Sequence, residues 1–144
     1  MRFFCIALLL FPLLLRAQMP ILKAEKQHWV SGIINGGSGN KYTIVAIAPA
    51  SDARFKVQGI WVGDNFFEVT VTKGLPYMDT KFSKGDTILL SFMENDKMQD
   101  NNVLDKPQPP KQYKGEALIL YRIKGKRKYT AIEKFTSLKE LLMR

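Results

Sequence analysis

Five basic residues within a short stretch near the end of the chain form the pattern with the clearest chemical meaning. A hairpin turn is predicted at Lys124-Gly125-Lys126, and a tyrosine flanks the stretch on each side. Cationic groups beside aromatic rings bind anionic glycans or single-stranded nucleic acid. The same charges on an edge hairpin also discourage aggregation between sheets. The residues of this candidate ligand-binding cluster are Tyr121, Arg122, Lys124, Lys126, Arg127, Lys128 and Tyr129.

Alternate residues of a strand share a face, so Arg122 and Lys124 are expected to align. Other aromatic residues offer a second kind of contact, because an exposed ring stacks on a sugar. Tyr77 lies beside Pro76 in a predicted loop and is the aromatic residue expected to be exposed, which makes it a further candidate for ligand binding. Trp61 and Phe67 are expected in the core, where large aromatic side chains usually lie.

The residue types needed for catalysis are sparse. His28 is the only histidine and Cys5 the only cysteine, so neither a paired nucleophile nor a cysteine or histidine metal site is expected. We therefore predict a protein without catalytic residues, metal or cofactor. The alternative is a small hydrolase of envelope glycans that uses paired carboxylates. The candidate carboxylates are Asp64, Glu68, Asp79 and Asp86, three of them at turn positions, where aspartate is favoured in any case.

The elements that must position these residues are short β-strands. A hairpin around a glycine-rich turn opens the fold, and Gly36, Gly37 and Gly39 are expected to supply its positive φ angles. Alternation of apolar and polar residues, with β-branched bulk, marks the further strands. The seven expected strands are His28–Ile34, Lys41–Ile47, Arg54–Val62, Phe66–Thr72, Thr87–Met93, Gly115–Ile123 and Arg127–Phe135.

The fold class predicted from this pattern is a mainly β domain, an antiparallel β-sandwich or small barrel of about seven strands. No helices alternate with the strands, which argues against a parallel sheet. A short C-terminal helix is expected, with Ser137 as its cap and Glu140 completing a capping box. Residues 95–112 are polar and rich in proline, and they are expected to form a long loop that is either a connector or a binding loop.

The first 17 residues are typical of a secretory signal peptide. Arg2 is followed by an apolar run from Phe3 to Leu15 that is too short to span a bilayer, and Arg16-Ala17-Gln18 resembles a cleavage region. Residues 18–144 would then form a single exported domain without cysteine. The full chain carries a formal net charge of +9, which favours contact with anionic surfaces. Outside the cytoplasm these include lipopolysaccharide and acidic glycans, while specific nucleic-acid binding is not expected.

Three short motifs strengthen this prediction: Gly36-Gly37-x-Gly39-x-x-Tyr42, Lys84-Gly85-Asp86, and Tyr113-Lys114-Gly115-x-Ala117 before the basic hairpin. With them, the chain resembles small uncharacterised exported β-rich proteins of Gram-negative bacteria. The resemblance implies a periplasmic or secreted location and brings no activity or catalytic residue. We therefore expect a non-catalytic binding or envelope-associated module, whose partner is an anionic glycan, lipopolysaccharide or another envelope protein. A structural subunit of an envelope complex is the other alternative, beside the hydrolase.

Overall fold

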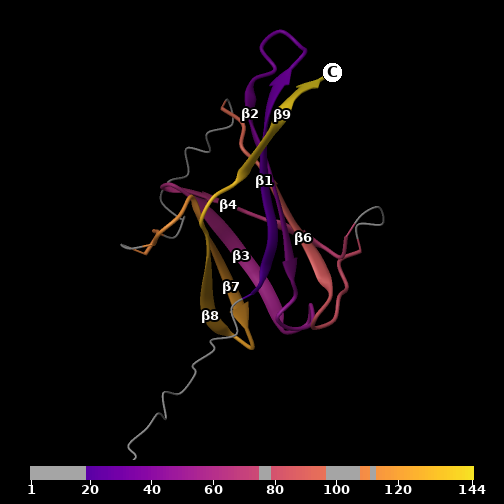
Figure 1. Cartoon of the computed structure of the whole chain (residues 1–144), viewed down its shortest axis with the longest axis vertical. Coiled ribbons are helices and arrows are strands. Elements are labelled where there is room, and N and C mark those ends of the chain that lie inside the picture. The colour runs from indigo at the N-terminus through magenta and orange to yellow at the C-terminus, as the bar shows by residue number, and fades with distance from the viewer. Residues whose placement is uncertain (1–18, 75–78, 97–107, 111–112) are drawn as a thin grey trace, which may run out of the picture.

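The computed structural model describes residues 19–74, 79–96, 108–110 and 113–144, and within these ranges the chain consists of strands and loops without a helix. One sheet has five strands in the order β5-β6-β2-β1-β9, and the other has four in the order β4-β3-β7-β8 (Figure 1). The strands are β1 (Ile21–Ser31), β2 (Ser38–Ile47), β3 (Phe55–Val62), β4 (Asn65–Phe67), β5 (Thr70–Thr72), β6 (Thr87–Met93), β7 (Ala117–Ile123), β8 (Lys126–Ile132) and β9 (Thr136–Met143).

Several sequence predictions fall on other parts of the chain. The expected signal peptide, Tyr77 and most of the 95–112 loop lie outside the described residues. Within the described ranges, the structure holds no helix of the length and apolar character needed to cross a membrane.

The two sheets pack face to face around a shared core and do not close into a barrel. Ile44 of β2 and Leu90 of β6 meet Ile60 of β3 and Ile119 of β7, and all four are fully buried. This confirms the predicted β class and the alternation that defines its inner faces. The segment predicted as one strand, 66–72, is divided: β4 pairs with β3, whereas β5 pairs with β6 in the other sheet.

The expected first hairpin is present, with Trp29 of β1 opposite Gly39 of β2. Its positive φ angles belong to Asn35 (66°) and Gly37 (84°), whereas Gly36 and Gly39 are not among the positive-φ residues. Gly39 serves a different purpose, because the carbonyl of Glu94 lies where a side chain at this position would have to be. β1 also begins seven residues earlier than predicted, at Ile21.

The predicted C-terminal helix is wrong. Residues Thr136–Met143 form β9, which pairs in parallel with β1 and leaves all of its side chains exposed. A helix this short is marginal in water unless it buries an apolar face. Here the open edge of β1 supplies backbone hydrogen-bond partners instead. Phe135 anchors the start of the segment, since its ring is buried against Tyr42 and its N–H donates to Glu116 Oε2 at 2.9 Å.

Tyr42 of β2 is a buried member of the main core. Its hydroxyl donates to Glu94 Oε2 at 3.3 Å, and the side-chain amide of Asn40 donates to the same oxygen. Burial, together with the negative charge of Glu94, raises the pKa of Tyr42 to about 12. The phenol of Tyr42 therefore stays neutral in the folded protein at a pH at which an exposed tyrosine is already ionised.

This raised pKa predicts a loss of stability in alkaline solution. In the unfolded chain Tyr42 releases its proton near pH 10, but in the folded protein it does so only at about 12. The unfolded state is therefore favoured as pH rises from 10 to 12, by about 1–2 kcal/mol. Tyr42→Phe should remove this part of the pH dependence. Urea unfolding of both proteins between pH 8 and 11.5 tests it, and parallel curves for the two proteins would contradict it.

Candidate anion-binding face

The four-stranded sheet has an inner face towards the core and an outer face with its own chemistry. Residues directly opposite each other in antiparallel strands point to the same side. Ile119 and Tyr121 of β7 point into the main core. Leu118, Leu120 and Arg122 alternate with them and therefore point outwards. The outer face therefore consists of Leu118, Leu120 and Arg122 together with the residues of β3 and β8 that stand opposite them.

A row of three cations crosses this outer face. Arg122 of β7 stands opposite Lys56 of β3 on one side and Arg127 of β8 on the other. Strands lie about 4.8 Å apart, so the row spans about 10 Å. Like charges directly opposite one another destabilise a sheet. The ion pairs found within the described residues, Lys23–Glu25 and Lys73–Asp86, do not involve this row. An anion lying over it would relieve the repulsion.

The central member of the row carries an unused donor. The Nε atom of Arg122 is buried and donates to no group among the described residues. A buried donor without a partner costs about 1–3 kcal/mol. A guanidinium presents its donors in a planar fork that matches carboxylate, phosphate or sulfate oxygens. Arg122 is therefore the residue of this face with the strongest reason to accept an anionic group.

Aromatic and aliphatic residues form a second cluster beside the row. Trp61, Leu118 and Leu120 are buried on the outer face, and Phe66 and Tyr113 pack against them. The Trp61 ring lies 5.0 Å from that of Phe66 and 6.3 Å from that of Tyr129. Tyr113 fixes this arrangement by donating its hydroxyl to the carbonyl of Gly63 at 2.8 Å. Tyr129 is the exposed ring of the group and directly adjoins the cations, two residues from Arg127 on β8.

The structure divides the basic cluster expected from the sequence. Arg122, Arg127 and Tyr129 share the outer face, as a ligand site requires. Tyr121 does not belong to the site, because it is buried in the main core, where its hydroxyl accepts from the N–H of Met19 at 3.3 Å and from Thr130 Oγ1 at 3.2 Å. The sequence prediction included Tyr121 in the cluster because a tyrosine in a β-strand can lie either on the core face or on the solvent face of the sheet.

The remaining basic residues of the hairpin point elsewhere. Lys128 stands opposite Tyr121, and Lys126 stands opposite Ile123, so both lie on the inward side of the edge strand β8. The expected alignment of Lys124 with Arg122 is wrong, because β7 ends at Ile123 and Lys124 occupies the turn with φ 50°. Lys56 was not singled out from the sequence. The alternation around Phe55 already places it on the outer side, but its pairing with β7 is not readable from local sequence.

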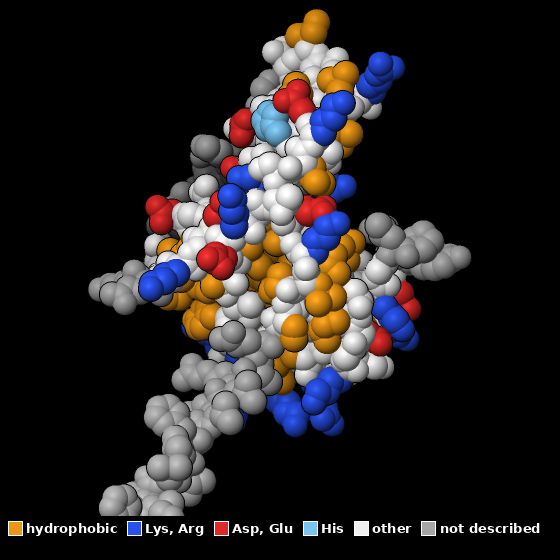
Figure 2. All heavy atoms as spheres, in the orientation of Figure 1, with side chains coloured by type: hydrophobic (Ala, Val, Ile, Leu, Met, Phe, Trp, Pro, Cys, Tyr) orange, Lys and Arg blue, Asp and Glu red, His pale blue; other side chains and the backbone are white. Residues whose placement is uncertain are grey.

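Basic side chains also gather visibly at one end of the molecule. Figure 2 shows Lys and Arg side chains at the lower end, where the β7–β8 turn lies in Figure 1. The cation row crosses β3, β7 and β8 next to that turn, since Arg122 and Arg127 form the second residue pair of the hairpin. The cation row is therefore close to the basic side chains of the turn.

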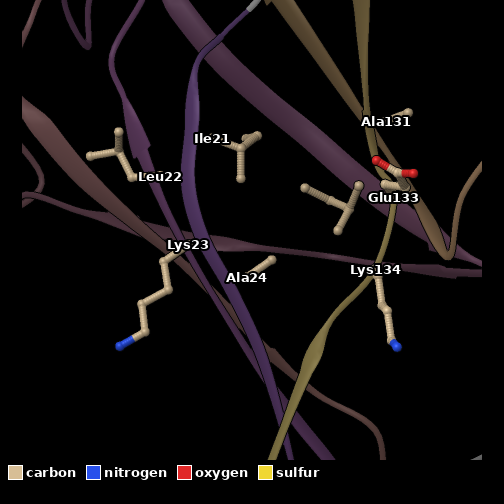
Figure 3. Close-up of a pocket in the computed structure, with 8 residues that line it drawn as sticks. Ile21, Leu22, Lys23, Ala24, Ala131, Glu133 and Lys134 are labelled. Carbon is tan, nitrogen blue, oxygen red and sulfur yellow. The ribbon is translucent and has the colours of Figure 1, made fainter.

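A cleft of about 350 Å³ lies between the open edges of the two sheets. It is lined by residues 21–24 of β1 and 131–134 at the end of β8. Ile21 and Ala24 point across it towards β8, whereas Leu22 and Lys23 point away (Figure 3). Its lining combines aliphatic side chains with the polar groups of Glu133 and Lys134.

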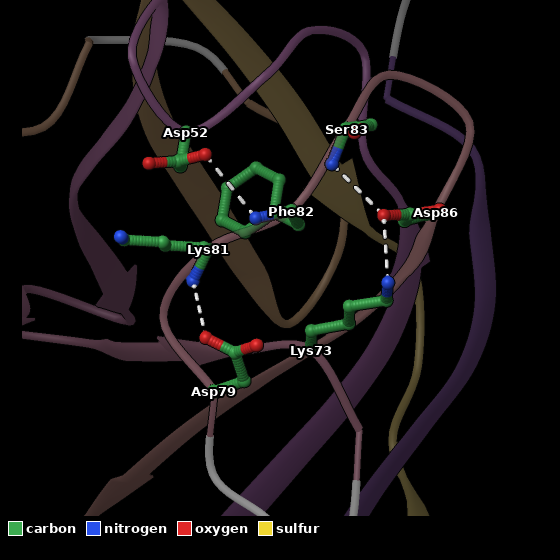
Figure 4. A network of polar contacts seen from close by, with 7 residues as sticks. All are labelled: Asp52, Lys73, Asp79, Lys81, Phe82, Ser83 and Asp86. Atoms are coloured by element: carbon green, nitrogen blue, oxygen red, sulfur yellow. Dashed lines mark hydrogen bonds and ion pairs between the residues drawn. The ribbon is translucent and has the colours of Figure 1, made fainter.

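Three aspartates accept hydrogen bonds from backbone N–H groups of the loop before β6. Asp52 accepts from the N–H of Phe82 at 3.2 Å, Asp79 from that of Lys81 at 2.9 Å, and Asp86 from that of Ser83 at 2.8 Å (Figure 4). The bond from Ser83, together with Lys73 at 3.4 Å, lowers the pKa of Asp86. Two of the carboxylates considered for a hydrolase thus stabilise a loop. No three histidine, cysteine or acidic side chains converge on a metal position in the part of the chain that the structure describes.

Comparison with known proteins adds no assignment to this geometry: no protein-family model, no curated protein and no solved structure matches the chain. The chemistry of the outer face is therefore inferred from the cation row and the aromatic rings beside it.

Proposed function

We propose that this chain is an exported, non-catalytic β-sandwich module that binds an anionic glycan, with lipopolysaccharide as the example found at a bacterial envelope. The observation that carries the proposal is the register of Lys56, Arg122 and Arg127 across three neighbouring strands. Sulfate, phosphate or carboxylate groups along the glycan would lie over this row. A sugar ring would stack on the exposed face of Tyr129, which adjoins it.

The proposal is tested by removing the row without changing the shape of the side chains much. Lys56→Gln/Arg122→Gln/Arg127→Gln is expected to lower the affinity for a heparin-like glycan or lipopolysaccharide by about tenfold or more at low salt, because charged contacts to a polyanion act together. Binding is measured by calorimetry at 50 and 300 mM salt. Affinity of the native protein should fall as salt rises, while neutral oligosaccharides should not bind through this face.

Two matched variants separate the row from general charge. Lys41→Gln/Lys81→Gln/Lys84→Gln removes the same number of charges from exposed positions elsewhere. Lys124→Gln/Lys126→Gln/Lys128→Gln removes them from the same hairpin but not from the outer face. In both variants the affinity for the polyanion should fall by about threefold at most. Equal losses in all three variants would show that only net charge matters, and that outcome would refute the site.

A further inference from the structure

The first hairpin extends beyond the rest of the molecule and ends in an apolar tip. β1 and β2, with β9 beside them, continue upwards past the end of the four-stranded sheet (Figure 1). Ile33 and Ile34 lie in the turn at this end and are 70% and 90% exposed. Leu142 and Met143 of β9 pair with Val30 and Ser31 just below the turn and are 59% and 40% exposed. Figure 2 shows hydrophobic side chains at the upper end of the molecule.

The arm that carries the tip is held firmly. Trp29 is buried and donates its indole N–H to the carbonyl of Glu94 at 3.2 Å. The strand β6 is prolonged along the arm, since the N–H groups of Glu94 and Asp96 donate to the carbonyls of Asn40 and Ser38 at 2.8 and 2.9 Å. The apolar residues are therefore presented in a fixed position at the end of a rigid support.

Several backbone N–H groups of the turn donate hydrogen bonds to other groups of the turn and of β9. Ser31 N–H donates to Gly37 O at 3.0 Å, Gly32 N–H to Met143 O at 2.6 Å, and Gly36 N–H to Ile33 O at 2.9 Å. The N–H of Ile33 is bonded to Ser31 Oγ at 3.2 Å. Unsatisfied backbone groups are what make loops costly in hydrocarbon, and each bond made within the turn removes part of that cost.

The charges of the turn itself favour the same environment, and the acidic group described beside it, Asp96, lies below the turn, where its carboxylate accepts from Ser38 Oγ at 2.9 Å. No Asp or Glu occurs between Lys26 and Ser51, a stretch that contains the whole hairpin end, and Arg144 lies beside Gly32. An aspartate or glutamate side chain in the turn would resist entry into a bilayer surface, whereas a cation beside it interacts well with phosphate headgroups. The tip is also convex, so it fits a deformable surface better than a flat protein face.

We propose that the apolar tip, defined as Ile33, Ile34, Leu142 and Met143, inserts into the interfacial region of a lipid bilayer. Ile33 and Ile34 would enter first, with Leu142 and Met143 at the level of the headgroups. This surface is distinct from the proposed glycan site, because the tip and the β7–β8 turn lie at opposite ends of the long axis (Figure 1).

The test measures flotation with vesicles of phosphatidylcholine, alone or with phosphatidylglycerol. Ile33→Ser/Ile34→Ser is expected to reduce partitioning by about tenfold or more, because two exposed aliphatic side chains supply most of the apolar area at the tip. The control Leu22→Ser/Met93→Ser changes two other exposed apolar residues, 60% and 47% exposed, away from the tip and should bind as the native protein does. The variant Lys56→Gln/Arg122→Gln/Arg127→Gln should still bind phosphatidylcholine vesicles.

A second readout reports insertion directly. Ile34→Trp should give a blue-shifted emission on vesicles and be quenched by brominated lipid chains. Absence of vesicle binding by the native protein, equal losses in tip and control variants, or an unquenched tryptophan would each overturn the proposal. So would a tip variant that keeps its vesicle binding but dissociates an oligomer in sedimentation, because the tip would then be a contact between protein chains.

Discussion

Trp61→Ala is expected to lower the free energy of unfolding by about 3–5 kcal/mol, as removal of a fully buried large aromatic side chain does. The size of this loss is informative because Trp61 points away from the main core. It is 1% exposed on the outer face of the four-stranded sheet, where Leu118 and Leu120 form a cluster with it. Chemical denaturation with an unchanged m-value measures the loss.

Tyr129→Ala is the control for this experiment. Its ring stacks on Trp61 but is 38% exposed, so its removal should cost only about 1 kcal/mol. A loss below about 1 kcal/mol for Trp61→Ala would mean that the outer face is not packed as described. The candidate glycan site would then lack the rigid base on which Tyr129 rests.

Gly39→Ala is the second substitution with a large expected effect, about 3 kcal/mol or more. A methyl group at this position would overlap the backbone carbonyl of Glu94, and backbone cannot move aside as a flexible side chain does. The arm would have to separate from residues 94–96, which would also break the hydrogen bond from Trp29. Thermal unfolding and the emission of Trp29 report both changes.

Gly125→Ala provides the comparison. This glycine sits in the β7–β8 turn with φ 78° and has open space around its Cα, so alanine is strained there but meets no other atom. Its cost should be about 1 kcal/mol. Similar losses at the two positions would contradict a steric role for Gly39.

These two glycines show what local sequence can and cannot predict. The Lys124-Gly125 turn is predictable, because a tight hairpin needs positive φ and glycine supplies it. The need for Gly39 is not, because its constraint comes from Glu94, 55 positions further along the chain. Strands such as β3, β6, β7 and β8 were predicted within a few residues from alternation alone. β9 was not, because Leu138, Leu141 and Leu142 fit a helical stripe and the open edge of β1 is a long-range feature.

The candidate site likewise has a part that local sequence predicts and a part that depends on long-range pairing. That Arg122, Arg127 and Tyr129 lie near one another was predictable, because a hairpin brings its two strands together over a few residues. Lys56 was missed because its contact with Arg122 depends on the pairing of β3 with β7 across 66 positions. Tyr121 was wrongly included because alternation does not say which of two faces is the core when both are apolar. Its neighbours Leu118 and Leu120 on one side and Ile119 on the other illustrate that ambiguity.

The parallel pairing of β9 with β1 also sets the order in which the molecule is completed. β1 is paired with β2 early, as a hairpin of neighbouring strands, but its other edge stays open until residues 136–143 are available. An open edge is a template for pairing with other chains. Contacts over more than 100 positions also slow folding. The finished sheet therefore forms only once residues 136–143 are available, and until then this edge of β1 is open to pairing with other chains.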